Sequence, residues 1–276
     1  MTPTHGIHPI CTGTVAVKVP FLTRKGGEIT SKLRILASQS FTQPFPVLAW
    51  LIEHEEGDFL IDTGMSEASS APGYLQSIGR FDAWLSDRMC RFDMAPGSGL
   101  GPQLHRVRAR GTEGLRIILT HLHTDHISGL ADVPGVEVLV NQAEWQHPSG
   151  APKRLLAALR PVCFELQQDA KSAFTASYTL TRARDLFVVA APGHTPNHCA
   201  VILRRAGMTF LFTGDAVYNQ GQLLRNEIAG SHTSVDLAFA TMKAMRQFTH
   251  EGPTIVLPSH DSDSERRLRA IEIFPQ

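Results

Sequence analysis

The sequence has few cysteines, no excess of either charge and no long apolar run, and each shortage excludes a class of protein. The four cysteines in 276 residues show no CxxC pair or regular spacing, which argues against a disulfide scaffold. Lysine plus arginine equals aspartate plus glutamate, at 26 each, so charge gives no reason to expect a nucleic acid or an anionic membrane as partner. No apolar run approaches the roughly 20 residues that span a bilayer, and the N-terminal stretch lacks the pattern of a signal peptide. We therefore expect a cytoplasmic protein.

Short apolar runs of strand character, separated by turn residues, make up much of the chain. "PVLAWLIEHEEGDFLIDTG" reads as two strands around a Glu-Glu-Gly turn, and further strands are predicted in "LRIILT", "VEVLVN", "LFVVAAPGH", "CAVILRR", "MTFLFTGD" and "TIVLPSH". Helical spacing predicts helices in "SVDLAFATMKAMRQF", with a Ser or Thr N-cap, and in "DSERRLRAIEIF". Clustered strands with helices between them, and no linker of biased composition, predict one α/β domain over residues 1–276.

Residues 65–114 have no clear pattern and are long for a plain connection. They include a run of small residues and a Gly/Pro-rich patch, "APGSGLGP". Trp84, Leu85, Met89 and Phe92 have the spacing of one helical face. Connections of this length are uncommon unless they are functional, so we expect part of the segment to cover a functional site.

Three histidines and an aspartate fall within six consecutive positions, in "HLHTDH" at residues 121–126. They follow the apolar run "LRIILT", and three more candidate ligands also stand at the ends of predicted strands. Strand ends are where a rigid scaffold places functional side chains. The full set is His121, His123, Asp125, His126, His194, Asp215 and His260.

Five imidazoles and two carboxylates form a nitrogen-and-oxygen donor set that suits zinc, and also iron, cobalt or manganese. Seven ligands are too many for one tetrahedral ion, so we expect two divalent ions. His121, His123 and His194 would serve one ion, and Asp125, His126 and His260 the other, with the two oxygens of Asp215 bridging them. A surface loop that happens to be rich in histidine would explain an HxH pair alone, but it does not explain the three further candidates.

The motifs "HLHTDH", "GHTPNH", "TGD" and "SHD" resemble those of the metallo-β-lactamase superfamily, from "FLIDTG" to "SHD". The resemblance implies an αβ/βα four-layer sandwich with the metal site at the edge between two β-sheets. Within the superfamily, the chain is similar to the N-acyl-homoserine lactonases, which are quorum-quenching enzymes. The similarity rests on "DTGMSE", "GDAVY", "EIAG", "IVLPSHD" and the closing "IFPQ".

The lactonase resemblance implies hydrolysis of a lactone ring by a hydroxide held between the two ions. Tyr218, three residues after Asp215, would bond the substrate carbonyl, and Asp125 would carry a proton to the leaving oxygen. Asp62 and His198 are expected to hold ligands in place, although a carboxylate at a turn also bonds its own backbone. A tyrosine at a strand end can equally belong to the core.

An apolar groove for the acyl chain is expected beside Tyr218. The candidates to line it are Met65, Trp84, Met89, Phe92, Met94 and Ala229, although Met and aromatic residues more often belong to the core. The resemblance also implies a homodimer, and segment 65–114 is the candidate for its interface.

Two positions depart from the lactonase motifs. Asn197 stands where glycine is usual, and we expect the turn to survive because Asn tolerates a positive φ. Ile127 and Ser128 replace Ala and Gly after "HLHTDH", and are expected to crowd the cavity.

Three functions compete at this stage. The first is a metal-dependent lactonase of N-acyl-homoserine lactones. The second is a hydrolase of another lactone, ester, thioester or phosphoester in the same fold, which an Arg/Lys cluster near the metals would favour for phosphates. The third is a metal-free binding or scaffold module, which has no reason to keep seven mutually dependent ligands.

Overall fold

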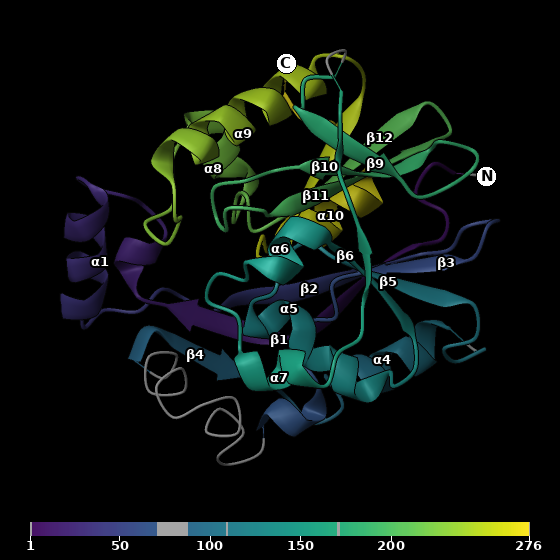
Figure 1. The fold of residues 1–276 in the computed structure, drawn as a ribbon, viewed down its shortest axis with the longest axis horizontal. Coiled ribbons are helices and arrows are strands. Elements are labelled where there is room, and N and C mark those ends of the chain that lie inside the picture. Colours follow the sequence, from purple (N-terminus) through teal and green to yellow (C-terminus); the bar gives the residue numbers. More distant parts are fainter. Residues whose placement is uncertain (1, 71–87, 109, 170–171, 276) are drawn as a thin grey trace.

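The computed structural model describes residues 2–70, 88–108, 110–169 and 172–275 (Figure 1). Two mixed β-sheets form the centre of the fold. The seven-stranded sheet runs in the order β4 (Cys90–Asp93), β1 (Ile7–Val17), β2 (Phe45–Ile52), β3 (Asp58–Ile61), β5 (Leu115–Leu119), β6 (Glu137–Asn141) and β7 (Val162–Phe164). The six-stranded sheet runs in the order β13 (Thr254–Pro258), β12 (Met208–Gly214), β11 (Cys199–Arg205), β10 (Leu186–Ala190), β9 (Ala176–Thr179) and β8 (Gln167–Gln168).

Helices lie on the outer faces of both sheets (Figure 1). The α-helices are α1 (Glu28–Ala37), α4 (Leu100–Val107), α5 (Thr124–Ile127), α6 (Gln142–Gln146), α7 (Lys153–Ala157), α8 (Gln220–Arg225), α9 (Val235–Thr249) and α10 (Ser264–Ala270). The described residues also form the short 3-10 helices η1 (Val19–Phe21), η2 (Glu67–Ser70) and η3 (Ser128–Asp132). Figure 1 shows α8 and α9 on one side of the molecule and α4, α5 and α7 on the other, with the sheets between them.

Apolar side chains that point alternately to the two faces of each strand produce these layers. In β11, Val201 and Leu203 point into the core between the sheets, while Ala200 and Ile202 face the helical layer of α8 and α9. The same split occurs in β2, where Trp50 faces the other sheet and Leu51 faces the layer of α4. Period-two burial on both faces of a sheet requires a partner layer on each side. The observed arrangement is therefore the predicted αβ/βα four-layer sandwich.

Parallel strand pairs bring chain segments that are far apart in sequence to the same edge. β3, β5 and β6 are parallel neighbours in one sheet, and β12 and β13 are parallel neighbours in the other. The carboxyl ends of parallel strands lie at one edge of the sheet. Hydrogen bonds from Leu48 N to Ser259 O and from Cys199 N to Thr120 O link the two sheets there.

Most sequence predictions of elements are confirmed, and the differences have local causes. The eight predicted strands are present, and α9 begins after Ser234, whose hydroxyl accepts from Leu237 N. The C-terminal helix ends at Ala270, earlier than predicted, because Ile271 adopts φ 53°. β1 and α1 were not predicted individually.

The prediction of one helical face from Trp84, Leu85, Met89 and Phe92 is wrong for Phe92, although Met89 is helical. Phe92 lies in β4, because that segment pairs with the edge of β1 in antiparallel register. Trp84 and Leu85 lie outside the described residues.

In the described ranges, no helix has the length and apolar character needed to cross a membrane. All four cysteines are free thiols.

Candidate metal centre

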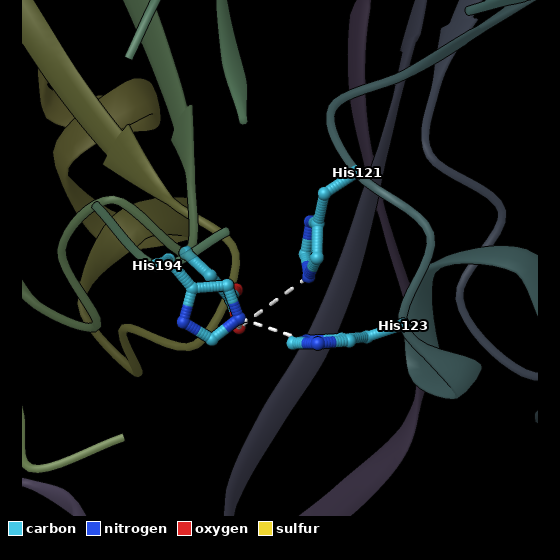
Figure 2. Close-up of side chains that lie close together, drawn as sticks. His121, His123 and His194 are labelled. Carbon is cyan, nitrogen blue, oxygen red and sulfur yellow. Dashed lines mark hydrogen bonds and ion pairs between the residues drawn. The ribbon is translucent and has the colours of Figure 1, made fainter. Parts of the chain in front are cut away.

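All seven predicted ligands lie at one edge of the molecule, and both sheets supply them. His121, His123, Asp125 and His126 follow β5 in the seven-stranded sheet. His194, Asp215 and His260 follow β10, β12 and β13 in the six-stranded sheet. Figure 2 shows the rings of His121 and His123 approaching from one side and the ring of His194 from the other, all pointing toward one another. The site therefore lies where the two sheets meet, as predicted.

The side chains form two groups of potential ligands, which match the two predicted sets except that Asp215, predicted to bridge them, falls in the first group. His121, His123, His194 and Asp215 form one group, and Asp125, His126 and His260 form the other. Within each group, one ligand atom from every member lies within 4.8 Å of the others.

The two oxygens of Asp215 face different groups. Its Oδ2 lies 3.3 Å from His194 Nε2 and 4.0 Å from His121 Nε2. Its Oδ1 lies 3.2 Å from both His126 Nε2 and His260 Nε2. A carboxylate placed in this way can bridge two cations, so the geometry agrees with the predicted role of Asp215.

Outer hydrogen bonds fix the tautomers of four histidines. The rings of His126 and His260 each donate Nδ1–H, to Asp62 Oδ2 and to Pro46 O, both at 2.8 Å. His121 Nδ1 lies 3.0 Å from Thr120 Oγ1, whose own proton goes to Asp62. His123 donates from Nε2 to Ser149 O at 3.0 Å. In each ring, the other nitrogen therefore faces the centre, where its lone pair can bind a cation once the nitrogen is deprotonated.

Several of these inward atoms lie near one another but have no hydrogen-bond partner in the described part of the chain. His121 Nε2, His126 Nε2 and Asp215 Oδ1 are buried and make no hydrogen bond. His123 Nδ1 and His194 Nε2 lie only 2.8 Å apart. Converging lone pairs without donors are what a cation site requires, whereas a histidine-rich surface loop would be solvated. The donor set and its geometry fit two divalent metal ions.

Burial and neighbouring charges shift the pKa of several candidate ligands when no cation is bound. Burial, reinforced by neighbouring imidazoles, lowers the pKa of His121 and His194 well below its usual value. Burial alone would raise the pKa of Asp215, but His260, His126 and His194 hold it well below the ordinary range. His121 and His194 are thus neutral beside an ionised Asp215. Burial would lower the pKa of His126 and His260, but Asp215 and the neighbouring aspartates raise it, so a divalent cation must displace protons from these two rings.

Asp62 and His198 support the ligands through contacts that the structure shows. Asp62 follows β3 with φ 55° and accepts from His126, Thr120 N and Thr120 Oγ1, each at 2.8 Å. His198 Nε2 accepts from the backbone N of Asp215 at 3.1 Å. Burial lowers the pKa of His198 to about 3, so its ring is neutral. Asp62 therefore orients the His126 side chain, whereas His198 positions the backbone of Asp215.

Two further contacts bring the ligand loops together. Gly150 has φ 70°, and a Cβ there would lie 2.8 Å from His123 Nε2, so only glycine allows this loop to approach the ring. Glu144 on α6 is fully buried and accepts from Thr195 Oγ1 at 2.8 Å, while its Oε1 has no hydrogen-bond partner in the described part of the chain. The carboxyl group of Glu144 therefore joins α6 to the loop after β10.

A cavity of ≈ 480 Å³ opens from the ligand cluster. Tyr218 stands at its inner end, with its ring centroid 5.9 Å from that of His194 and 5.7 Å from that of His260. Most of the remaining wall is apolar and comes from β1, η1, α1, β2, β4 and the residue before β4: Val15, Val17, Phe21, Ile35, Leu36, Phe45, Met89, Cys90 and Phe92. Among the described residues that line it, Lys32 is the one lysine or arginine.

The predicted substrate-contacting residues divide into three cases. Met89 and Phe92 line the cavity, as expected. Met65 is buried against Val15, Val17 and Val47, and Ala229 is buried beside the cavity, so neither lines it. Both predictions are therefore corrected to core positions, and Gly230 and Ser231 line the wall in place of Ala229. Met94 packs against the same cluster as Met65, and Trp84 lies outside the described residues.

The two departures from the lactonase motifs have simple outcomes. Asn197 does not need a positive φ: in the described chain the strained residue of that turn is Gly193, at φ 141°. The Asn197 side chain instead donates to Ala143 O at 3.2 Å. The predicted crowding by Ile127 and Ser128 is wrong, because Ile127 packs into the core and Ser128 bonds back to Thr124 O.

Several residues around the site were missed. His232 is buried with its ring centroid 5.5 Å from that of His194, and Ser231 Oγ lies 2.9 Å from the Tyr218 hydroxyl. Both follow "EIAG" directly, and that adjacency was the signal available. The cavity residues of β1, η1 and α1 had no such signal, because they lie far from every histidine motif.

Comparisons with known proteins agree with this architecture. An N-acyl homoserine lactonase of Bacillus sp. is 26% identical over 234 residues, which cover 84% of this chain and 86% of that protein. A structure of an N-acyl homoserine lactone hydrolase, with N-hexanoyl-L-homoserine at its catalytic metal centre, superposes with a TM-score of 0.74 at 20% identity, covering 98% of this chain and 97% of that one. AidC, a dizinc quorum-quenching lactonase, gives 0.60 at 15% identity, with 92% and 87% covered.

The two structures show that the fold is shared. The sequence profile described as the metallo-beta-lactamase superfamily matches residues 42–260, a range that begins just before β2 and ends at His260. That range contains all seven clustered ligands together with Asp62, His198 and Tyr218. This chain therefore belongs to the metallo-beta-lactamase superfamily.

Proposed function

We propose that this protein is a metal-dependent hydrolase that opens the lactone ring of N-acyl-homoserine lactones. The observation that carries the proposal is the junction of two features: a cluster fit for two cations, and an apolar cavity that opens from it past Tyr218. The relatives named above as N-acyl homoserine lactonases support the same activity. An acyl chain suits the cavity wall, and the polar lactone head suits its inner end.

We assign His121, His123, His194 and Asp215 to one ion, and Asp125, His126, His260 and Asp215 to the other. Zinc is the proposed metal, because imidazole and carboxylate donors without thiolate suit catalytic zinc. A bound pair of such ions supplies Lewis acidity, lowering the pKa of water from 15.7 to about 7 and polarising a carbonyl oxygen.

Tyr218 is the proposed hydrogen-bond donor to the lactone carbonyl oxygen. Burial, together with the negative charge of Asp215, raises the pKa of the phenol well above 10, so the hydroxyl keeps its proton at neutral pH. Its ring is held by stacking on Phe45, with centroids 6.3 Å apart. A fixed donor aimed at an oxygen that becomes more negative stabilises the transition state more than the substrate.

Asp125 is the proposed carrier of the proton to the leaving alkoxide. Its carboxylate lines the cavity, and its Oδ2 lies 3.4 Å from His260 Nε2. A carboxylate at the boundary between the ligand cluster and the cavity reaches both the nucleophile and the leaving group.

Tyr218→Phe tests the role of the hydroxyl. Turnover of a short-chain homoserine lactone should fall about 10- to 100-fold, as expected for loss of one donor to a developing oxyanion, while metal content stays the same. Tyr178→Phe, a change at a partly exposed tyrosine of β9 away from the cavity, is the matched control. An unchanged rate would remove Tyr218 from the mechanism.

A substrate panel separates the lactonase from its nearest alternative, a hydrolase of another ester, thioester or phosphoester. We expect kcat/KM to be highest for acyl-homoserine lactones and to rise with chain length until the apolar wall is filled. A phosphotriester, a thioester and a β-lactam should be poor substrates. Lys32 alone does not form the cationic cluster that would favour phosphates. A phosphotriester preferred over every lactone would overturn the proposal.

Three further properties stay predictions. We propose a single domain over residues 1–276, a cytoplasmic location and a homodimer. Segment 65–114, whose described residues include the cavity-lining Met89, Cys90 and Phe92, is the proposed substrate cover and dimer contact. Light scattering of the purified protein measures its oligomeric state directly.

A further inference from the structure

The hydroxyl of Tyr218 has one close polar neighbour whose role the activity leaves open. Ser231 Oγ lies 2.9 Å from Tyr218 Oη, and both residues line the cavity. The phenol ring is fixed by Phe45, His194 and His260, and the Tyr218 backbone N donates to Gln222 Oε1 at 2.7 Å. The position of Oη is therefore set by packing, but the direction of its O–H bond is not.

The loop that carries Ser231 is held on both sides of it. Gly230 N donates to Phe21 O at 2.7 Å, and a Cβ on Gly230 would lie 2.0 Å from Pro20 O. On the other side, His232 Nε2 donates to Ala216 O at 3.1 Å.

Thr233 extends the same restraint. Its backbone N and its hydroxyl both donate to Gly193 O, at 2.8 and 3.1 Å. Ser231 is thus presented to Tyr218 by a loop fixed to η1, to the turn after β12 and to the turn that carries His194. Such preorganisation is what a group that directs a proton requires.

The donor count of the pair determines what Ser231 can do. A phenol has one proton, and so does a serine hydroxyl, so one of the two must accept from the other. When the Tyr218 O–H donates its hydrogen bond to a carbonyl oxygen, Tyr218 Oη is free to accept a second hydrogen bond, and Ser231 Oγ–H can donate it. A chain of donors in a site of low dielectric strengthens each bond.

We infer that Ser231 is a positioning residue, which directs the Tyr218 O–H toward the substrate and donates to Tyr218 Oη as charge develops on the carbonyl oxygen. The inference rests on the proposed function for its substrate, but the pairing of the two hydroxyls does not depend on which ester or lactone is hydrolysed. Neither residue is among the clustered metal ligands.

Matched substitutions separate the hydroxyl from the shape of the side chain. Ser231→Thr keeps the hydroxyl, whereas Ser231→Val has the same shape without it. We expect kcat to fall roughly fivefold in Ser231→Ala and Ser231→Val, the size of one net hydrogen bond, with little change in KM. Ser231→Thr should retain more activity than Ser231→Val, and metal content should be equal in all three.

A double-mutant cycle with Tyr218→Phe distinguishes positioning from general structural support. If Ser231 acts through Tyr218, then Ser231→Ala should change nothing further in the Tyr218→Phe background. An equal loss in both backgrounds, or no loss when Tyr218 is present, overturns the inference. Lactone, ester or thioester substrates all serve, whichever the enzyme turns over.

A readout independent of activity keeps the pairing testable if no substrate is hydrolysed. Ultraviolet titration of the metal-loaded protein, with Tyr218→Phe subtracted to remove Tyr74 and Tyr178, reports the ionisation of Tyr218. Loss of the Ser231 bond should make the phenolate harder to form, so the titration should move to higher pH in Ser231→Ala and Ser231→Val but not in Ser231→Thr. An unmoved titration contradicts the pairing. Absence of all hydrolysis with a shifted titration instead contradicts the proposed function alone.

Discussion

At the scale of single residues, the site depends on groups that no metal would touch. Asp62 is the clearest case, because one buried carboxylate accepts hydrogen bonds from His126 and from the two donors of Thr120. It thereby decides which nitrogen of His126 faces the centre. Residues of this kind are visible in sequence only through their motif, and Asp62 was predicted from its place in "DTG".

Asp62→Asn should weaken metal binding about 10- to 100-fold. The substitution replaces one of the two acceptor oxygens by an NH2 donor, so the side chain can no longer accept from both Thr120 N and the His126 ring. Competition with a chromogenic chelator measures the affinity. Asp58→Asn is the control: Asp58 is equally buried on β3 but pairs with Arg108 and Arg110. That control should lose stability and keep its metal affinity. Equal affinities for wild type and Asp62→Asn would refute the assignment.

Glu144 gives the protein a pH dependence with a defined sign. Burial raises the pKa of Glu144 from 4.5 to about 7, so the folded state favours the protonated form. The stability contributed by this group is fully present below pH 4.5 and is lost as pH rises through about 7, at a cost approaching 3 kcal/mol.

Glu144→Gln should remove that dependence. The difference in unfolding free energy between wild type and Glu144→Gln can be measured by urea denaturation of chelator-treated protein from pH 5 to pH 8.5. It should shift in favour of the variant as pH rises to about 7 and level off above that pH. Taking the difference cancels the titration of the clustered histidines, which both proteins share. Parallel curves would show that Glu144 ionises freely in the folded state.

At the scale of secondary-structure elements, the ends of strands and the turns after them determine where the ligands go. Gly193 precedes His194 at φ 141°, and a Cβ there would lie 2.6 Å from Ala238 Cα on α9. The turn can therefore bring His194 inward only because residue 193 has no side chain.

Gly193→Ala should destabilise the fold by roughly 2–4 kcal/mol through steric overlap and backbone strain, and should reduce metal content. Gly207→Ala is the matched control, since Gly207 also has positive φ, at 77°, but nothing lies within 4 Å of its Cβ position. This control measures the cost of backbone strain without the steric overlap. Urea denaturation compares the two, and equal losses would argue against the close approach to α9.

The strands that carry ligands were predictable because each is a short apolar run followed by a polar ligand, as in "LRIILT" before His121. The residues that form the wall of the cavity could not be predicted in this way. Val15, Phe21 and Ile35 lie on β1, η1 and α1, and they reach the site only because β1 pairs with β2 and β4. Phe92 was assigned to a helix because four residues cannot show that their partner is a strand far away in sequence.

At the scale of the whole molecule, two features hold the two β-sheets together. One is the apolar core between the sheets, and the other is the ligand cluster at their edge. Trp50 and Phe212, from opposite sheets, pack with ring centroids 5.4 Å apart. At the adjoining edge, ligands from both sheets converge on Asp215. A bound ion would therefore stabilise the folded state in addition to providing the chemistry.

Metal removal should lower the thermal unfolding temperature. An ion at a concentration 1,000 times its dissociation constant stabilises the native state by about 4 kcal/mol, so chelator treatment should produce a shift of several degrees that added zinc reverses. Elemental analysis of the untreated protein should give close to two ions per chain. Protein that is metal-free after careful preparation, with an unchanged unfolding temperature, would support the scaffold alternative.

The hydrogen bond from Cys199 N to Thr120 O crosses from one sheet to the other beside the ligands. Its amide can exchange with solvent deuterium only when the two halves separate locally, and ions held from both sides would resist that separation. The exchange rate at residue 199 is therefore a gauge of occupancy that requires no substrate, and it should slow as each equivalent of metal is added.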